Sequence, residues 1–458
     1  MVPLGLSTRT RALHLIAVAG ALGCTPALVE PGGRPDPADS NADTAPAEIV
    51  YPQPQRVLLV IWDTVRAGHL SACGYPRETT PHLDALAASS TVFTQANPGS
   101  YWTLSSMASL FSGMFSHNHR VDYDLDAEGY VLDDGILTLA EAMQARGFYT
   151  AVFTNQSLFY QNASLSQGFD EWRFLDGTAI VPNAESLMDR MGEEPWFLVA
   201  YWMGAHAPYI PDAQHDLWSS GSVDDINVRG CDGVDPGMYP ESWVCFNDLN
   251  SGAVQWNERQ WQFIRDKYDG TIHQHDAWLG SLWAALEQRG LADTTLFTLT
   301  ADHGEALADH GQINAWHVWP YDDTQLVPLI VRFPEVFPAA SVGTQVRTMD
   351  LYATLMRLTG GLDGHPMDSE PLTEVIEGRG GDRVSVGATA AGDGRQWYRF
   401  DGYKLIWSRE REEQQARELF DLGADPHEQD NLWDLEPSRV AQLEAAHAAF
   451  LEETAIQR

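Results

Sequence analysis

The sequence has few basic residues and no basic tract. Of its 458 residues, 28 are Lys or Arg and 64 are Asp or Glu, which gives a formal net charge of −36. This composition argues against nucleic acid and anionic membranes as general partners. A negatively charged substrate would therefore have to be held locally, by a bound cation. The acidic excess also fits a salt or solubility adaptation, which would carry no information about the substrate.

Long apolar runs are lacking as well, apart from a short one near the start of the chain. Two arginines precede the apolar run from Leu13 to Leu22, and Cys24 follows it. This pattern is typical of a bacterial export signal, and the run is too short to span a bilayer. We expect residues 1–24 to form a signal peptide and residues 25–55, which are rich in Pro, Ala and Asp, to form a linker.

Cysteine is also scarce, with four residues in the chain. Cys24 ends the segment Ala-Leu-Gly-Cys, which resembles a lipobox and predicts an envelope lipoprotein attached to the membrane through lipidated Cys24. Simple secretion to the periplasm or the medium is the alternative. Cys231 and Cys245 lie in a loop-like region of an exported protein, so we predict a disulfide between them. Cys73 then remains as a small, partly buried side chain.

Apolar, β-branched runs alternate with helical patterns along most of the chain. This alternation predicts an α/β fold with a mostly parallel sheet flanked by helices. A long helix is expected at residues 256–287, ended by Arg289 and Gly290. The expected strands cover residues 57–62, 149–153, 196–202, 296–300 and 326–331.

The pattern changes after about residue 365 to short segments with turn signals. Asp401-Gly402 lies between alternating apolar residues and predicts a hairpin. Residues 436–453 have the spacing of an amphipathic helix. We therefore divide the chain beyond the linker into a catalytic domain at 56–365 and a C-terminal subdomain at 366–458, which contains a small antiparallel sheet plus a helix.

Polar residues follow three of the expected strands, at the point where each strand ends. Asp63 follows the first, His206 follows the strand at 196–202, and Asp302 with His303 follows the strand at 296–300. Ligands of open α/β sheets bind at these strand ends, so the four residues are predicted to converge. Carboxylates with an imidazole suit a divalent cation such as Mn²⁺ or Zn²⁺. Taken singly, each of these residues would be an ordinary polar residue at the end of a strand.

Thr103 precedes a helix rich in small residues that Gly113 closes. Its position has the character of an N-cap, and capping alone would explain a threonine there. A helix N-terminus also presents free amides and the positive end of the helix dipole to an anion. In that case the Thr103 hydroxyl would lie beside a phosphoryl or sulfuryl group.

In combination and order, these segments resemble the sulfatase-like family of the alkaline phosphatase superfamily. His206-Ala-Pro-Tyr209 resembles the His-x-Pro-Tyr segment of that family, and residues 300–311 with His317 resemble its second metal motif. The similarity runs from about residue 55 to 435 and includes residues 57–70, 74–84, 103–113 and 418–432. The resemblance implies an alkaline phosphatase-like fold and a metal-dependent hydrolase or transferase.

The sequence departs from true sulfatases at the nucleophile. Sulfatases carry a Cys or Ser that is converted to formylglycine, in a Cys-x-Pro-Ser-Arg sequence, whereas this chain has Thr103-Leu-Ser-Ser-Met. Threonine cannot be oxidised to an aldehyde, so that maturation is excluded. The usual tandem Asp pair is reduced to Asp63-Thr64. This pattern resembles the threonine branch of the family, which includes phosphodiesterases and enzymes that transfer phosphoglycerol or phosphoethanolamine.

The resemblance implies a role for each candidate residue. Thr103 would be the nucleophile, acting with one divalent cation (Mn²⁺, Zn²⁺, Ca²⁺ or Mg²⁺). The substrate would be a phosphate or sulfate (di)ester of a small molecule, a lipid headgroup or a glycan. A noncatalytic surface lipoprotein that binds anions or glycans on the same fold is the alternative. The expected cation ligands are Asp63, Thr103, Asp302 and His303. His206 and His317 are expected to be catalytic, by binding nonbridging oxygens of the substrate or protonating the departing oxygen. Arg66 would neutralise the anion or form a structural ion pair.

Overall fold

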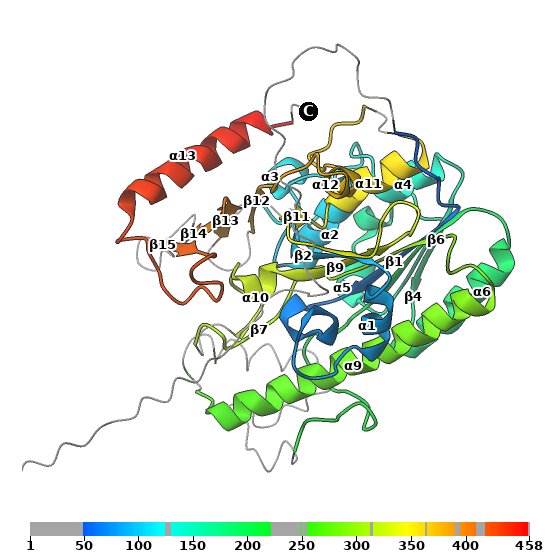
Figure 1. The fold of residues 1–458 in the computed structure, drawn as a ribbon, viewed down its shortest axis with the longest axis horizontal. Coiled ribbons are helices and arrows are strands. Elements are labelled where there is room, and N and C mark those ends of the chain that lie inside the picture. Colours follow the sequence, from blue (N-terminus) through cyan, green and yellow to red (C-terminus); the bar gives the residue numbers. More distant parts are fainter. Residues whose placement is uncertain are drawn as a thin grey trace, which may run out of the picture.

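The computed structural model describes residues 49–123, 130–220, 249, 253, 255–311, 315–361, 364–389, 394–408 and 417–456. A large nine-stranded sheet, covered by helices, stands beside a four-stranded sheet (Figure 1). The expected signal peptide and the Cys231–Cys245 pair lie outside the described residues. Within the described ranges, no helix has the length and apolar character needed to cross a membrane.

The centre of the large sheet is β1 (Arg56–Trp62), which runs parallel to β5 (Trp196–Trp202) on one side and β6 (Thr295–Thr300) on the other. β3 (Tyr149–Thr154) and β4 (Glu171–Phe174) continue the parallel arrangement beyond β5. Every residue of β1, β5 and β6 is buried, as expected for parallel strands covered on both faces. The predicted positions of these strands are thus confirmed to within a residue or so.

The other edge of the sheet contains one strand of opposite direction. β9 (Val327–Arg332) runs antiparallel both to β6 and to β2 (Thr91–Asn97). β10 (Ala340–Val342) and β11 (Val346–Arg347) pair in parallel with β2. The sequence indicated the strand at 326–331 but gave no sign of its direction, and β2 was not predicted. Its sequence, TVFTQAN, contains too many polar residues to form a continuous apolar run.

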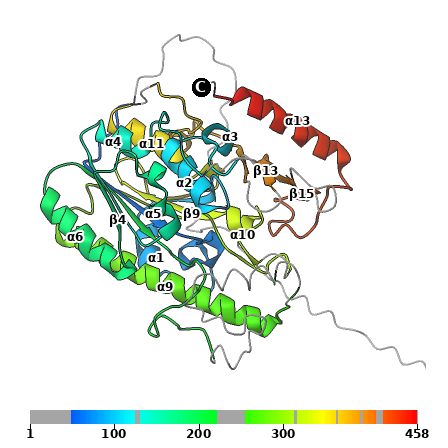
Figure 2. The same cartoon turned by 180° about the vertical axis from the view of Figure 1, so that it is seen from behind.

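Helices form a layer on each face of the large sheet (Figure 2). Alternate residues of β1 point to the two layers: Leu58 and Val60 belong to the core that includes residues of α9, and Val57 and Leu59 to the core that includes residues of α2. The first layer consists of α1 (Pro81–Ala87), α6 (Ile180–Met191) and α9 (Glu258–Gln288), and the second of α2 (Thr103–Ser112), α4 (Leu139–Gln144), α5 (Ser157–Gln161) and α11 (Asp350–Thr359). The long helix expected at 256–287 is therefore confirmed.

Several short elements complete the large unit. A two-stranded sheet, β7–β8, follows β6. α12 comes after the domain boundary predicted at residue 365, yet Leu372 and Val375 pack in the core shared with α2 and α11. The bounds are η1 (Ala67–His69), η2 (Ser71–Cys73), α3 (Ser116–His119), η3 (Ala163–Ser166), η4 (Gly177–Ala179), β7 (Ala306–Leu307), β8 (Ala315–Trp316), α10 (Asp322–Gln325) and α12 (Leu372–Ile376).

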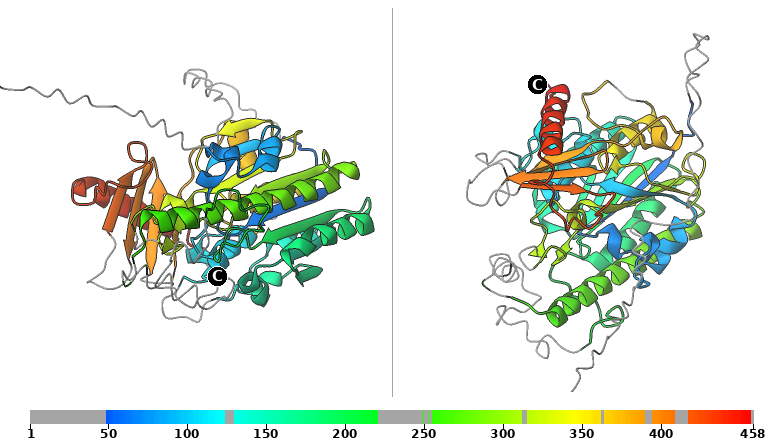
Figure 3. Two further views of the ribbon diagram at one scale, coloured as in Figure 1. Left: turned by 90° about the horizontal axis from the view of Figure 1, so that it is seen from below. Right: turned by 60° about the vertical axis from the view of Figure 1, so that its left-hand side comes forward.

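The small sheet and its helix form a unit beside the large sheet (Figure 3). β12 (Ser385–Ala388), β13 (Arg395–Phe400), β14 (Tyr403–Ser408) and β15 (Arg417–Asp421) pair antiparallel in chain order. Asp401 and Gly402 join β13 to β14 with φ values of 54° and 75°, the left-handed backbone of a tight two-residue turn. α13 (Pro437–Glu453) packs on this sheet through Val440 and Leu443. The predicted hairpin and helix are confirmed.

Cys73 is disulfide-bonded, and its partner is not among the described residues. The expectation that Cys73 would be left as an unpaired thiol is therefore wrong. It rested on pairing Cys231 with Cys245, because both lie in a loop-like region of an exported protein. Disulfide connectivity depends on which residues the fold brings together, and sequence separation does not determine it.

Candidate active site

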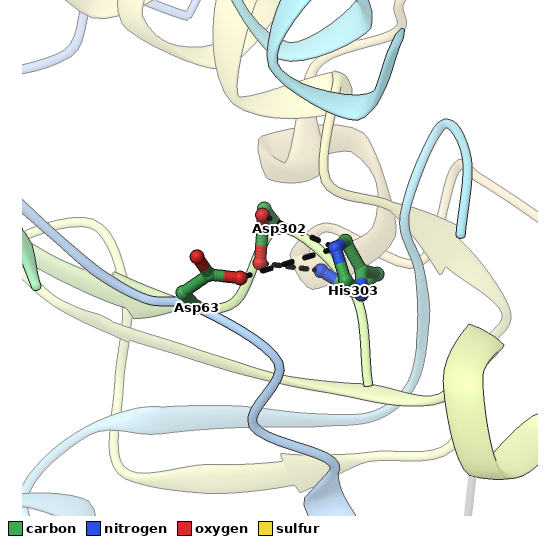
Figure 4. Close-up of side chains that lie close together, drawn as sticks. All are labelled: Asp63, Asp302 and His303. Carbon is green, nitrogen blue, oxygen red and sulfur yellow. Dashed lines mark hydrogen bonds and ion pairs between the residues drawn. The ribbon is translucent and has the colours of Figure 1, made fainter. Parts of the chain in front are cut away.

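Three ligand-type side chains meet at the C-terminal ends of the central strands. Asp63 directly follows β1, and Asp302 and His303 follow β6. Their carboxylate oxygens and imidazole nitrogen lie within 4.8 Å of one another, and all three side chains are buried. Figure 4 shows the three groups pointing toward a common centre. The convergence predicted for these residues from the strand ends is therefore present.

Thr103 joins this cluster from the start of α2. Its hydroxyl oxygen lies 3.3 Å from Nε2 of His303. The N-cap position of α2 belongs to Trp102, which has an extended backbone, and no side chain caps the helix. The prediction that Thr103 is the N-cap is thus wrong by one residue. The Thr103 hydroxyl makes no capping hydrogen bond. It faces the cluster formed by Asp63, Asp302 and His303 instead.

The Asp302 carboxylate is held by hydrogen bonds to both of its oxygens. The backbone N–H groups of Thr64 and His303 donate to Oδ1 over 3.1 and 2.8 Å. The Tyr201 hydroxyl donates to Oδ2 over 2.8 Å. In addition, the Ser106 hydroxyl donates to the Asp302 carbonyl, which anchors α2 against the loop after β6. The orientation of this carboxylate is therefore fixed from three segments of the chain.

His303 presents Nε2 to the cluster because its other ring nitrogen is engaged. Nδ1 donates to the carbonyl of Gly304 over 2.9 Å. Nε2 then lies 3.9 Å from Oδ1 of Asp63 and 3.5 Å from Oδ2 of Asp302. A backbone carbonyl that fixes the ring in this way is a common second contact of metal-binding histidines.

Asp63 supplies the best test of whether a cation fits here. The Gln156 side-chain amide donates to its Oδ2 over 2.7 Å, whereas the buried Oδ1 has no hydrogen-bond partner among the described residues. Burial, followed by the negative charge of Asp302, raises the pKa of Asp63 well above its ordinary value. A buried carboxylate oxygen needs a positive partner, so these residues fit a divalent cation.

The loop that follows β5 packs directly on the backbone of Asp63. The N–H of Asp63 donates to the carbonyl of Trp202, and the N–H of Ala205 donates to the carbonyl of Asp63. Gly204 lies so close that a β-carbon on it would be 2.2 Å from the Asp63 carbonyl oxygen, and its φ is +50°. Only glycine fits both conditions, so Gly204 allows the two strand ends to meet.

His206 and His317 lie beside the cluster, as predicted. The His317 ring centroid is 4.4 Å from that of His303 and 5.4 Å from that of His206. Burial lowers the pKa of His206 to about 4, and burial together with the two neighbouring imidazoles lowers the pKa of His317 well below its usual range. Both rings are thus neutral near pH 7 and become easier to protonate when an anion lies next to them.

Arg66 is engaged by the protein itself. Its guanidinium donates to both oxygens of Asp309, over 2.7 and 3.2 Å, and to the carbonyl of Glu305. The Nη2 nitrogen, which donates to Oδ1 of Asp309, also lies 2.6 Å from Nε2 of His69. These contacts support the structural ion pair that was the alternative to a substrate-binding role.

Three residues near the site were not identified from the sequence. Gln156 and Tyr201 contact the two carboxylates, and Oε1 of Glu305 lies 3.3 Å from Nδ1 of His317. Glu305 offered a signal, since it belongs to the Asp-His-Gly-Glu turn that begins at Asp302. Tyr201 is the penultimate residue of a buried strand and resembles ordinary core, while Gln156 has no local pattern.

The sequence profile of the family described as Sulfatase matches residues 55–362. The chain belongs to the sulfatase family. Among its relatives, the ulvan-active sulfatase of Formosa agariphila is 24% identical over 410 residues, which cover 83% of this chain and 77% of that protein. Arylsulfatase K of Xenopus laevis is 23% identical over 219 residues, which cover 45% of this chain and 40% of that protein. This protein is thus a sulfatase-family hydrolase.

Solved structures show the same fold. BT4656, in complex with its substrate D-glucosamine-2-N,6-O-disulfate, superimposes with a TM-score of 0.69 at 17% identity and covers 88% of this chain and 98% of its own. The phosphonate monoester hydrolase of Agrobacterium radiobacter gives a TM-score of 0.66 at 19% identity, with 88% of this chain and 95% of the hydrolase covered. The predicted alkaline phosphatase-like fold, with its small C-terminal antiparallel sheet, is confirmed.

Proposed function

We propose that this sulfatase-family protein is an exported, metal-dependent enzyme that cleaves or transfers phosphate esters or diesters, with Thr103 as its nucleophile. The observation that carries the proposal is the position of the Thr103 hydroxyl. It lies 3.3 Å from His303, inside the cluster of carboxylates and imidazole, and takes no part in capping α2.

The chemistry assigned to the chain's own residues is an in-line displacement. Thr103 Oγ gives its proton to one of the neutral imidazoles of His206 and His317 and forms a bond to phosphorus, while the bond to the leaving oxygen breaks and that oxygen takes up a proton. His206 and His317, which lie beside the cluster, bind nonbridging oxygens or donate this proton. Water or an acceptor alcohol then displaces Thr103 Oγ from phosphorus, which restores the hydroxyl.

A divalent cation held by Asp63, Asp302, His303 and Thr103 would favour ionisation of the hydroxyl and neutralise charge on the phosphoryl oxygens. Two features of the chain support its presence. The buried Asp63 Oδ1 has no hydrogen-bond partner among the described residues, and the Asp302 and His303 side chains are already oriented toward it. Removal of the ion by a chelator is therefore expected to abolish activity.

We prefer phosphorus esters to sulfate esters as substrates, because a threonine nucleophile cannot release its product by the carbonyl chemistry of formylglycine. A sulfated formylglycine hydrate decomposes by carbonyl chemistry at carbon, whereas an ester of Thr103 must be displaced at phosphorus or sulfur itself. The same fold occurs in a phosphonate monoester hydrolase and in a protein solved with a disulfated sugar substrate, so both substrate classes are found on it. Sulfate esters are the second candidate, because the family and several relatives, among them the ulvan-active sulfatase, are sulfatases by name.

The deciding experiment is a substrate screen on the purified full chain. Aryl phosphodiester, phosphomonoester, phosphonate and sulfate substrates are each offered with Mn²⁺, Zn²⁺, Ca²⁺ and Mg²⁺. We expect the highest kcat/KM with a phosphorus ester. A clear preference for sulfate would reverse the order of the two candidates. Protein that binds no metal when supplemented, and turns over none of these esters, would instead be a noncatalytic binding protein for anions or glycans.

Export and membrane attachment belong to the same proposal. The segment that ends in Cys24 supports lipidation, which would place the enzyme at the cell envelope near lipid-headgroup or glycan esters. We expect the wild-type protein in the membrane fraction and a Cys24→Ser variant outside it. Equal distribution of the two would show that Cys24 is not the anchor.

A further inference from the structure

His317 is carried by a short segment at the edge of the large unit. It follows β8, which pairs with β7 in a sheet of two strands, and residues 318–321 lead from it to α10. A two-stranded ribbon is only marginally stable by itself. Asp63 and Asp302, in contrast, follow β1 and β6, which are buried along their whole length. The position of His317 therefore depends on what holds the residues that come after it.

Arg395, the first residue of β13, contacts the two residues that directly follow His317. Its Nη1 donates a hydrogen bond to the carbonyl of Val318 over 2.9 Å. Its guanidinium carbon lies 3.6 Å from the centre of the Trp319 ring. The arginine is 8% exposed, so water competes little for either contact. Because a guanidinium is planar, it can donate and stack at the same time, and it fixes the backbone of Val318 together with the side chain of Trp319.

The small sheet also holds the next part of the same segment. The Tyr321 hydroxyl lies 3.0 and 2.9 Å from the two carboxylate oxygens of Glu418 on β15. The Asp322 carboxylate accepts hydrogen bonds from Lys404 on β14 over 2.8 Å and from Arg399 on β13 over 3.1 Å. Side chains of the small sheet thus grip the chain between His317 and α10, and the contact with Val318 is the one nearest to His317 along the chain.

The imidazole of His317 must be fixed both in its rotation and in the position of its backbone. Oε1 of Glu305, 3.3 Å from Nδ1, restrains the rotation. The contacts of Arg395 restrain the backbone that follows. The His317 ring centroid lies 4.4 Å from that of His303, so a shift of the segment would move the imidazole relative to the reacting groups. A displacement of about 1 Å can cost about 100-fold in rate.

We propose that Arg395 is a positioning residue, which holds His317 in the active site through Val318 and Trp319. The groups assigned to the cation and to the substrate oxygens all belong to the large unit, and the small C-terminal sheet contributes by fixing one of them. The inference rests on the proposed function, since it requires His317 to act on the substrate.

The first measurement is kcat of the full-length Arg395→Met variant with an aryl ester that the wild type turns over. A nitrophenyl leaving group keeps slow variants measurable. Methionine keeps an apolar chain against Trp319 but cannot donate to Val318, so kcat should fall by about 10- to 100-fold. Metal content by elemental analysis should match that of the wild type, because the carboxylates of the cluster follow β1 and β6. Loss of the metal would show a general disturbance of the site and overturn the assigned role.

A double-mutant cycle with His317→Ala separates positioning from a general structural effect. If Arg395 acts through His317, then adding Arg395→Met to His317→Ala should change kcat by less than about twofold, because the group that it positions is already gone. An effect of Arg395→Met that is equally large in both backgrounds would overturn the inference.

Two further variants cover poor folding and loss of stability. Arg395→Lys keeps a positive charge and a donor but lacks the planar group that stacks on Trp319, so its kcat should lie between those of the wild type and Arg395→Met. It takes the place of Arg395→Met in the cycle if the methionine variant does not fold. Arg439→Met is the matched control, because Arg439 lies over the ring of Tyr403 in the same small unit, 4.5 Å from its centre.

The control variant should keep the kcat of the wild type. A loss in Arg439→Met as large as that in Arg395→Met would mean that any weakening of the small unit slows the enzyme, which would overturn the specific role of Arg395. A wild-type protein that turns over no ester would overturn the proposed function, and the inference with it. An active wild type with additive effects in the cycle would overturn the inference alone.

Discussion

At the scale of single residues, the Thr103 hydroxyl carries the proposed chemistry. Thr103→Ala should lose several orders of magnitude in kcat, because the nucleophile and one cation ligand disappear together. Thr103→Ser should retain part of the rate, since it keeps the hydroxyl but loses the methyl group that restricts its rotamer. With a slow substrate, mass spectrometry should find one added phosphoryl group on the peptide that contains Thr103.

The stability of the same variant separates catalysis from capping. Loss of an N-cap costs about 1 kcal/mol of the free energy of unfolding, whereas this hydroxyl makes no capping hydrogen bond. Thr103→Ala should therefore unfold in urea close to the wild-type midpoint. Near-normal turnover in Thr103→Ala would leave the protein without an identified nucleophile and contradict the mechanism.

Asp302 tests the metal assignment at one position. Asp302→Asn keeps an oxygen that can accept from the backbone N–H groups of Thr64 and His303, but removes the negative charge. We expect a folded protein with far less than one equivalent of metal by elemental analysis. Asp309→Asn is the control, because that carboxylate pairs with Arg66 and is not among the residues grouped with Asp63 and His303 in the described part of the chain. Full metal content in Asp302→Asn would remove Asp302 from the ligand set.

At the scale of elements, one helix caps another. Asp276 lies within α9 and accepts hydrogen bonds from the backbone N–H groups of His82 and Leu83, both over 2.8 Å, at the start of α1. Asp276→Ala would remove the acceptor of the buried N–H group of Leu83 and of the partly buried N–H group of His82. The free energy of unfolding should fall by about 2 to 3 kcal/mol, measured by denaturant titration. Since α1 contributes no site residue, kcat of the folded enzyme should be unchanged; a large loss of kcat would show coupling between α1 and the site.

The sequence could predict elements and residues that leave a local pattern, but not features that depend on tertiary contacts. β1, β5 and β6 were predicted because a strand buried on both faces is a continuous apolar run, and the β13–β14 hairpin because its turn requires Asp401-Gly402. The direction of β9 could not be predicted, since pairing with β6 and β2 is a tertiary property. The cluster residues follow strands and carry a local signal. Gln156 and Tyr201 donate hydrogen bonds to the two carboxylates of the cluster, but the segments that contain them carry no local signal of this role.

At the scale of the whole molecule, stability should depend on pH through buried histidines. His447 on α13 packs edge-on against the rings of Tyr398 and Trp407, and burial lowers its pKa from 6.5 to about 4. As the pH falls below 6.5, the unfolded chain binds a proton that the folded chain cannot bind until about pH 4. The free energy of unfolding contributed by this group therefore decreases over that interval, by up to about 3 kcal/mol.

A substitution isolates this contribution. His447→Phe replaces the imidazole with a ring that cannot titrate, so urea midpoints measured between pH 7 and pH 4 should decline less steeply than in the wild type. His82→Gln serves as a control at a histidine that lies outside the packing of α13. Parallel curves for the wild type and His447→Phe would mean that His447 does not contribute to acid sensitivity.

The strand order also determines when the enzyme can become active after synthesis. β1 leaves the ribosome before the other strands, yet it ends between β5, which begins 140 residues later at Trp196, and β6, which begins at Thr295. Pairing over such separations is slow, because long loops must close before any contact forms. Asp63 therefore cannot meet Asp302 and His303 until most of the chain has been made. Such a delay suits the proposed export, in which the chain would cross a membrane unfolded before it binds the proposed cation.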